Sequence, residues 1–164
     1  MEPSLDNRQL CILLDVLKER EDSDVLEETF RLIAEQSYFL GVVNFSKQPI
    51  VQKDGSLRLQ PMTEIKFPML VNGDKQTFYP AFTDYMELKK WDQNSDQGMA
   101  LPFCIDDYVE ILEQDPTVSG IVINAFNQSF IVYKEMLQHL LEVRKQNKPY
   151  DKRRTFLQDI ALVK

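Results

Sequence analysis

Thr83, Asp84 and Asn124 are the residues whose types and positions best suit the binding of a small polar ligand. Thr83 and Asp84 follow the apolar stretch QTFYPAF and open a segment with a helical pattern, whereas Asn124 ends the apolar stretch GIVIN. If these stretches are neighbouring strands, the carboxamide of Asn124 faces the start of the helix. Backbone N–H donors, a hydroxyl and a carboxamide then suit a small polar ligand or a peptide carboxylate. Asp84 opposes an anion there, and the simpler interpretation is that Thr83 caps its helix and Asn124 shapes a turn.

Aromatic residues concentrate around the same junction, between residues 78 and 91. Aromatic side chains usually pack in cores, and exposed Trp and Tyr residues often anchor protein interfaces. We therefore add Trp91 to the candidate site. The candidate ligand- or partner-binding residues are Thr83, Asp84, Asn124 and Trp91.

The other reactive side chains do not form a recognisable catalytic or metal-binding set. Cys104 precedes a predicted helix, which can lower a thiol pKa, but the adjacent Asp106 and Asp107 act in the opposite direction, so we expect a buried structural thiol. His139 is the only histidine, lies beside the apolar stripe of its helix and is expected in solvent. One histidine with scattered cysteines cannot make a zinc site, and neither a glycine-rich phosphate loop nor a nucleophile elbow occurs. We expect no catalytic residue, no metal and no cofactor.

The composition indicates one globular domain. The chain has 164 residues, 43% of them apolar and 27% charged, and no apolar run approaches the roughly 20 residues that span a bilayer. Its N-terminus does not have the basic and apolar regions of a signal peptide. Two cysteines far apart suit a reducing compartment, so we expect a cytoplasmic protein.

The net charge of -7 is unevenly distributed. Residues 1–143 carry 12 Lys and Arg against 24 Asp and Glu, whereas residues 144–164 carry 7 against 2. The acidic body repels a phosphate backbone, so we expect no nucleic-acid partner. The basic segment is a solvated tail, a contact for an acidic partner or a segment that folds back onto the body.

The first half of the chain shows two helical patterns followed by short strands. Leucines recur at helical spacing between residues 5 and 17, and a second helix follows the polar break at 19–23, with Asp24 as its N-cap and an apolar face from Leu26 to Ala34. A buried strand is expected at 37–45, a short strand at 56–60, and an edge strand or bulge at 63–71, where Pro68 cannot donate a ladder hydrogen bond. Asn72-Gly73 predicts a hairpin turn.

The second half alternates strands and helices. Strands are expected at 76–82, 99–104, 120–124 and 129–132. Helices are expected after Thr83, after Asp106 or Asp107, and over 133–144, where the apolar face is the most regular. These patterns predict a single α/β (α+β mixed) domain. It has a mixed or largely antiparallel sheet with packed helices, two N-terminal helices and a C-terminal amphipathic helix. We expect the domain to cover residues 1–145, followed by a basic tail or short extra helix at 146–164.

This order of elements resembles the N-terminal domain of the SseB family. Three segments carry the resemblance: LEETFRLIAEQSYFLGVV, FYPAFTDYMELKKW and GIVINAFNQSFIVYKEMLQHL. Together they span roughly residues 5–142. Two features depart from the family, since Ala125 stands where a proline often follows the strand-ending Asn, and the chain leaves no room for the second domain of longer members. The resemblance implies a bacterial protein and a fold, and it implies no reaction.

We therefore expect a non-catalytic SseB-like module that binds a protein partner or a small ligand. The alternative is an enzyme that binds a small polar substrate at the strand ends near Thr83 and Asn124. A third interpretation is a homo-oligomer formed through residues 146–164.

Overall fold

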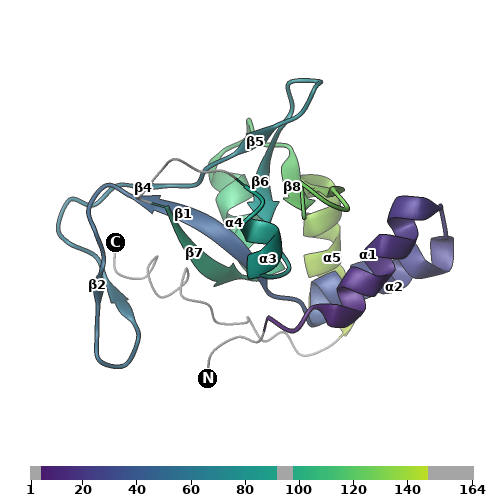
Figure 1. Cartoon of the computed structure of the whole chain (residues 1–164), viewed down its shortest axis with the longest axis horizontal. Coiled ribbons are helices and arrows are strands. Elements are labelled where there is room, and N and C mark those ends of the chain that lie inside the picture. Colours follow the sequence, from purple (N-terminus) through teal and green to yellow (C-terminus); the bar gives the residue numbers. More distant parts are fainter. Residues whose placement is uncertain (1–4, 92–97, 148–164) are drawn as a thin grey trace.

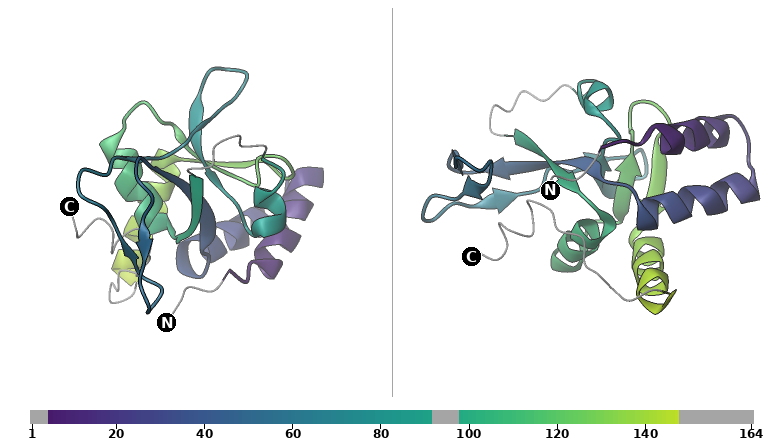
Figure 2. Two further views of the ribbon diagram at one scale, coloured as in Figure 1. Left: turned by 60° about the vertical axis from the view of Figure 1, so that its left-hand side comes forward. Right: turned by 90° about the horizontal axis from the view of Figure 1, so that it is seen from below.

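The computed structural model describes residues 5–91 and 98–147, and it begins with two helices that lie side by side at one end of the molecule (Figures 1 and 2). These are α1 (Arg8–Glu19) and α2 (Ser23–Glu35). The predicted cap of α2 at Asp24 is wrong by two positions. Asp22 is the N-cap, and its carboxylate accepts from the N–H groups of Asp24 and Val25. A carboxylate at this position satisfies two otherwise unpaired amides of the first turn.

The first sheet is antiparallel and has the order β4-β1-β7. Its central strand is β1 (Phe39–Phe45), flanked by β4 (Ile65–Lys66) and β7 (Gly98–Phe103). The predicted strand at 63–71 is in fact two strands, because Pro68 separates β4 from β5 (Leu70–Val71) and the two belong to different sheets. A small hairpin of β2 (Ile50–Val51) and β3 (Leu57–Arg58) projects at the end opposite the two helices (Figure 1).

The second sheet is mixed and has the order β5-β6-β8-β9. Its strands β6 (Thr77–Ala81) and β8 (Gly120–Ile123) are parallel neighbours, and β9 (Phe130–Tyr133) is antiparallel to β8. Leu40 of β1 and Phe82 after β6 exchange two backbone hydrogen bonds of 2.8 and 3.0 Å, which connect the two sheets. The predicted α/β fold with mixed β-structure and packed helices is thus confirmed.

The predicted hairpin at Asn72-Gly73 joins β5 to β6. The side chain of Asn72 accepts from the N–H groups of Asp74 and Gln76, at 3.0 and 2.9 Å. Lys75, rather than Gly73, adopts the left-handed conformation that closes the turn, with a φ of 63°. An Asn that binds its own backbone two residues ahead explains why the turn forms at this position.

The remaining helices are α3 (Tyr85–Leu88), α4 (Ile105–Gln114) and α5 (Lys134–Asn147). Two predicted caps are wrong. Asp84, rather than Thr83, caps α3 by accepting from the N–H of Glu87. Cys104 is the N-cap of α4, and Asp107 inside the helix accepts from the N–H of Cys104 at 2.9 Å. Helix α5 begins one residue later than predicted, because Tyr133 still belongs to β9.

The main core is formed by residues of both sheets and of helices α1, α2, α4 and α5. A smaller cluster of Leu40, Val42 and Phe82 lies where the two sheets join, with Trp91 packed against it. The predicted start of the tail at residue 146 is two residues too early, because α5 continues through Gln146 to Asn147. The rest of that prediction, from residue 148 to 164, lies outside the described residues.

Candidate functional site

The structure brings Thr83 and Asn124 together at the carboxyl ends of β6 and β8. The parallel register pairs Ala81 with Ile123, so the residues that follow each strand are adjacent. Asn124 Oδ1 accepts from the Thr83 N–H at 3.0 Å, and Asn124 Nδ2 donates to Thr83 Oγ1 at 2.9 Å. The two apolar stretches are thus neighbouring strands, and Asn124 contacts Thr83, the residue just before the N-cap of α3.

Asn124 adopts a left-handed conformation with a φ of 51°. Its C=O accepts from the N–H groups of Asn127 and Ser129, both at 2.9 Å, and these bonds close the turn into β9. Asn tolerates this conformation better than most residues. One residue thus shapes a turn through its backbone and joins two strands through its side chain.

Helix α1 covers this junction. Asn7, just before the helix, donates from Nδ2 to the C=O groups of Tyr38 and Thr83, at 2.7 and 3.0 Å. One turn later, the Cys11 thiol donates to Thr83 Oγ1 at 3.3 Å. Residues four apart lie on one face of a helix, so this face of α1 packs over the junction.

A second chain of hydrogen bonds continues from the junction to α1. Asn124 Nδ2 also donates to Gln128 Oε1 at 3.0 Å, and Gln128 Nε2 donates to Asp15 Oδ1 at 2.7 Å.

Burial raises the pKa of the Cys11 thiol, and the nearby Asp84 carboxylate adds to the shift. The thiol therefore stays protonated and acts as a hydrogen-bond donor.

The junction is closed to solvent. Thr83 is 0% exposed and Asn124 is 1% exposed. Their polar groups hydrogen-bond to one another and to α1, so a ligand reaches them only if α1 moves away. The geometry makes Thr83 and Asn124 a buried connection between the sheet and α1.

The other two candidate residues have separate positions. Asp84 caps α3 and also accepts from Thr83 Oγ1 at 3.1 Å. Trp91 packs on Phe82, with ring centroids 6.0 Å apart and a partly buried side chain. Neither residue lines a described groove.

Cys104 is fully buried, as expected, and both cysteines are thiols. The neighbouring Asp106 is 4% exposed and binds Arg144 of α5 through both of its carboxylate oxygens, at 2.7 and 2.8 Å. Arg144 Nη1 also donates to the C=O of Ala34 at 2.9 Å, so this ion pair joins α2, α4 and α5. His139 is exposed, as predicted.

No group of three or more metal-ligating side chains is found in residues 5–91 and 98–147. Within the same ranges, no helix has both the length and the apolar character needed to cross a membrane.

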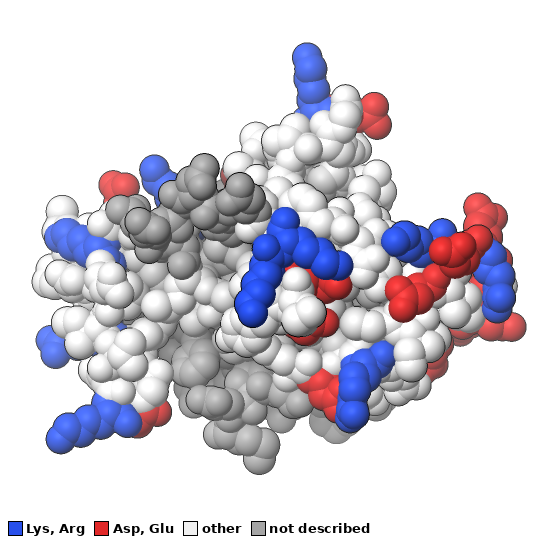
Figure 3. Space-filling view, in the orientation of Figure 1, with Lys and Arg blue, Asp and Glu red and all other residues white. Residues whose placement is uncertain are grey.

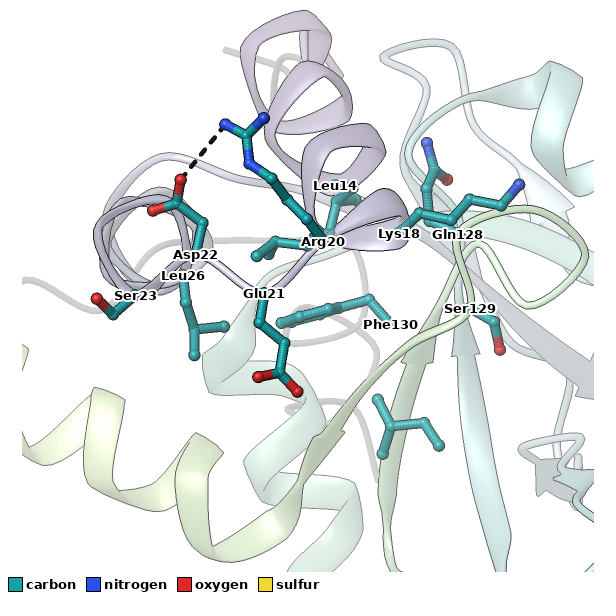
Figure 4. Close-up of a pocket in the computed structure, with 12 residues that line it drawn as sticks. Leu14, Lys18, Arg20, Glu21, Asp22, Ser23, Leu26, Gln128, Ser129 and Phe130 are labelled. Atoms are coloured by element: carbon teal, nitrogen blue, oxygen red, sulfur yellow. Dashed lines mark hydrogen bonds and ion pairs between the residues drawn. The ribbon is translucent and has the colours of Figure 1, made fainter.

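A groove of about 550 Å³ lies between the α1–α2 connection and the edge strand β9. The sequence did not single it out, because its apolar residues belong to two helical stripes and a short strand that were assigned to the core. Figure 4 shows the Phe130 ring extending from β9 toward the connection, where Leu26 and Glu21 lie beside it. The lining residues, here called the β9 groove, are Leu14, Leu17, Lys18, Arg20, Glu21, Asp22, Ser23, Leu26, Gln128, Ser129, Phe130 and Ile131.

The β9 groove has an apolar floor and a charged rim. Leu26 is 37% exposed although it lies on the apolar face of α2. On the rim, Arg20 pairs with Asp22 at 3.4 Å, and Lys18 donates to Asn127 at 3.2 Å. Because Asn127 is neutral, Lys18 and Glu21 keep one positive and one negative charge at the rim with no oppositely charged partner among the described residues.

A second groove, of about 580 Å³, lies between α2 and α5. Arg31 on its wall binds both Glu28 and Glu35. The charges of this groove are thus largely paired within α2, and its walls are helices on both sides.

Comparisons of the chain with protein-family models, with curated proteins and with solved structures gave no match.

Proposed function

We propose that the protein is a non-catalytic, SseB-like cytoplasmic module that binds a segment of a partner protein in the β9 groove. The observation that carries the proposal is the partly exposed apolar floor of this groove, with Leu26 open beside Phe130. Apolar hollows rimmed by polar residues are typical of protein-binding sites. The SseB assignment rests on the three sequence segments, and the cytoplasmic assignment is supported by the two cysteine thiols.

The Thr83–Asn124 junction supports the groove indirectly. By fixing α1 on the sheet, it sets the position of the groove wall that carries Leu14 and Leu17. The alternative function, an enzyme with a small polar substrate at this junction, requires α1 to leave, because Asn7 and Cys11 occupy the polar groups of Thr83.

Three variants separate the two sites. Leu26→Asp places a charge on the floor of the groove, and Ile12→Asp makes the same kind of change at a residue of α1 that is 63% exposed and outside the groove. Asn124→Ala alters the buried junction. Each variant and the wild type are used to capture partners from a bacterial extract, and each captured protein is then purified and its binding remeasured by calorimetry.

The proposal predicts that Leu26→Asp abolishes binding of the purified partner, while Ile12→Asp binds like wild type. Circular dichroism checks that the variants are folded. Equal binding by wild type and Leu26→Asp contradicts the groove as the site. Loss of binding in a fully folded Asn124→Ala protein, with Leu26→Asp unaffected, favours the alternative at the junction.

A further inference from the structure

We propose that the β9 groove takes an extended peptide that pairs with the free edge of β9 and carries a basic side chain next to an apolar one. This inference rests on the proposed function and specifies the chemistry of the partner segment. It follows from three features: the outer edge of β9, the apolar floor of the groove and the acidic residues that surround its rim.

Strand β9 is the last strand of its sheet, so one of its edges has no strand neighbour within residues 5–91 and 98–147. The Lys134 N–H donates to the Ser119 C=O at 2.9 Å, at the end of the antiparallel pairing with β8. Backbone groups alternate in direction along a strand. The N–H and C=O groups of Phe130 and Val132 therefore point toward β8, and those of Ile131 and Tyr133 point outward. An outward N–H and C=O at Ile131 can add one strand to the sheet.

Ile131 also lines the β9 groove, which places this free edge at the groove wall. A peptide strand paired there presents every second side chain to the same side, at a spacing of about 6.6 Å. The floor formed by Leu17, Leu26 and Phe130 lies close enough to receive one apolar side chain. The backbone pairing supplies affinity and the apolar hollow supplies selectivity.

The rim itself carries two basic and two acidic side chains, and the excess negative charge lies around it, in the α1–α2 connection and the first turns of α2. Residues 18–28 carry six acidic side chains against two basic ones. Figure 3 shows carboxylates gathered with a few basic side chains over the end of the molecule formed by α1 and α2. Arg20 is already paired with Asp22, whereas Glu21 lies at the groove. Electrostatic complementarity therefore favours a Lys or Arg in the bound segment.

The test is a display library of random twelve-residue peptides selected against the full chain. The enriched peptides are synthesised, and their affinities are measured for wild type, Ile131→Pro, Ile131→Ala, Glu21→Lys and Leu26→Asp. Ile131→Pro removes the outward N–H, and Ile131→Ala is its matched control, because Ala also shortens the side chain but keeps the N–H. Thermal unfolding checks each variant, and Glu21→Lys changes an exposed residue that does not threaten folding.

The inference predicts enrichment of peptides with a Lys or Arg beside an apolar residue. Ile131→Pro weakens their binding about tenfold more than Ile131→Ala, as expected for one lost hydrogen bond. Glu21→Lys weakens binding several-fold in low salt, and the difference shrinks in high salt.

Two outcomes overturn the inference while the groove remains the binding site. In the first, Leu26→Asp loses binding but Ile131→Pro and Ile131→Ala bind the peptides with equal affinity. In the second, the enriched peptides carry no basic residue and their affinity is unchanged by Glu21→Lys. A helical peptide in the groove gives the first of these outcomes. Equal affinity for wild type and Leu26→Asp instead contradicts the proposed function itself.

Discussion

The side chain of Asn124 extends the pairing of β6 and β8 by one residue, because it binds the backbone N–H and the hydroxyl of Thr83. A backbone C=O of a longer β8 would accept the same N–H. Here the chain turns at Asn124 instead, and the carboxamide replaces the missing strand residue. The Asn124 carboxamide thus satisfies the buried Thr83 N–H, which would otherwise be costly.

We expect Asn124→Ala to lower the free energy of unfolding by about 2 kcal/mol or more, because the Thr83 N–H loses its acceptor inside the protein. Alanine also tolerates the left-handed conformation poorly. Chemical denaturation measures the loss. Asn124→Gly is the matched control, since glycine adopts this conformation freely and should lose less stability. An unchanged denaturation midpoint in Asn124→Ala contradicts the structural role of the residue.

Helix α1 should loosen when Asn7 is changed. Asn7 is 6% exposed and connects the backbone of residues 38 and 83, so Asn7→Ala removes a donor from the buried Thr83 C=O and from the partly buried Tyr38 C=O. We expect faster hydrogen exchange in α1 than in wild type, with α4 unchanged. Arg8→Ala, which alters only an exposed ion pair with Asp6, is the control. Equal exchange in α1 for both variants argues against Asn7 as its anchor.

Much of the junction was predictable from residue patterns. QTFYPAF and GIVIN identify two apolar strands, and Asn at a strand end indicates a turn. The cover over these strand ends was not predictable, because Asn7 is 76 residues from Thr83 in the sequence and nothing in the pattern of α1 indicates this contact. The apolar residues of a helix predict that a face is buried, but they do not say against which neighbour.

The Asp106–Arg144 ion pair should make a large contribution that depends on both partners. Because Asp106 is almost fully buried, Arg144→Met removes both hydrogen bonds that the guanidinium donates to its carboxylate and should cost about 3 kcal/mol or more of unfolding free energy. The double variant Asp106→Leu with Arg144→Met should lose less than the sum of the two single variants. A double-mutant cycle measured by urea unfolding tests this, and strictly additive losses contradict a direct coupling.

Alkaline pH should destabilise the protein through its buried tyrosines. Burial raises the pKa of Tyr79 to about 12, with a further contribution from the Asp115 carboxylate. Burial also raises the pKa of Tyr108. The folded state therefore favours the neutral phenols, so this stability is present below the unfolded pKa of about 10 and is lost as pH rises toward 12. Urea titrations of Tyr79→Phe should show a smaller loss of unfolding free energy between about pH 9 and pH 12 than those of wild type. An identical pH profile contradicts this assignment.

The groove illustrates the limit of reading amphipathic patterns. Leu17 and Leu26 belong to apolar stripes that predict core positions, and Leu14 from the same stripe is indeed buried. The groove between the α1–α2 connection and β9 nevertheless leaves Leu26 37% exposed. Helix caps were also misplaced, because Asp22, Asp24, Thr83 and Asp84 all have capping side chains and only backbone geometry decides among neighbours.

The most direct test of the central claim is nuclear magnetic resonance of the full chain titrated with a selected twelve-residue peptide. We predict that the amide signals that shift most belong to the β9 groove, above all Leu26, Phe130 and Ile131. The signals of Thr83, Asp84 and Trp91 should remain nearly unchanged. Shifts concentrated at Thr83, Asp84 and Trp91, with the groove unaffected, would contradict the claim that the protein binds its partner between the α1–α2 connection and β9.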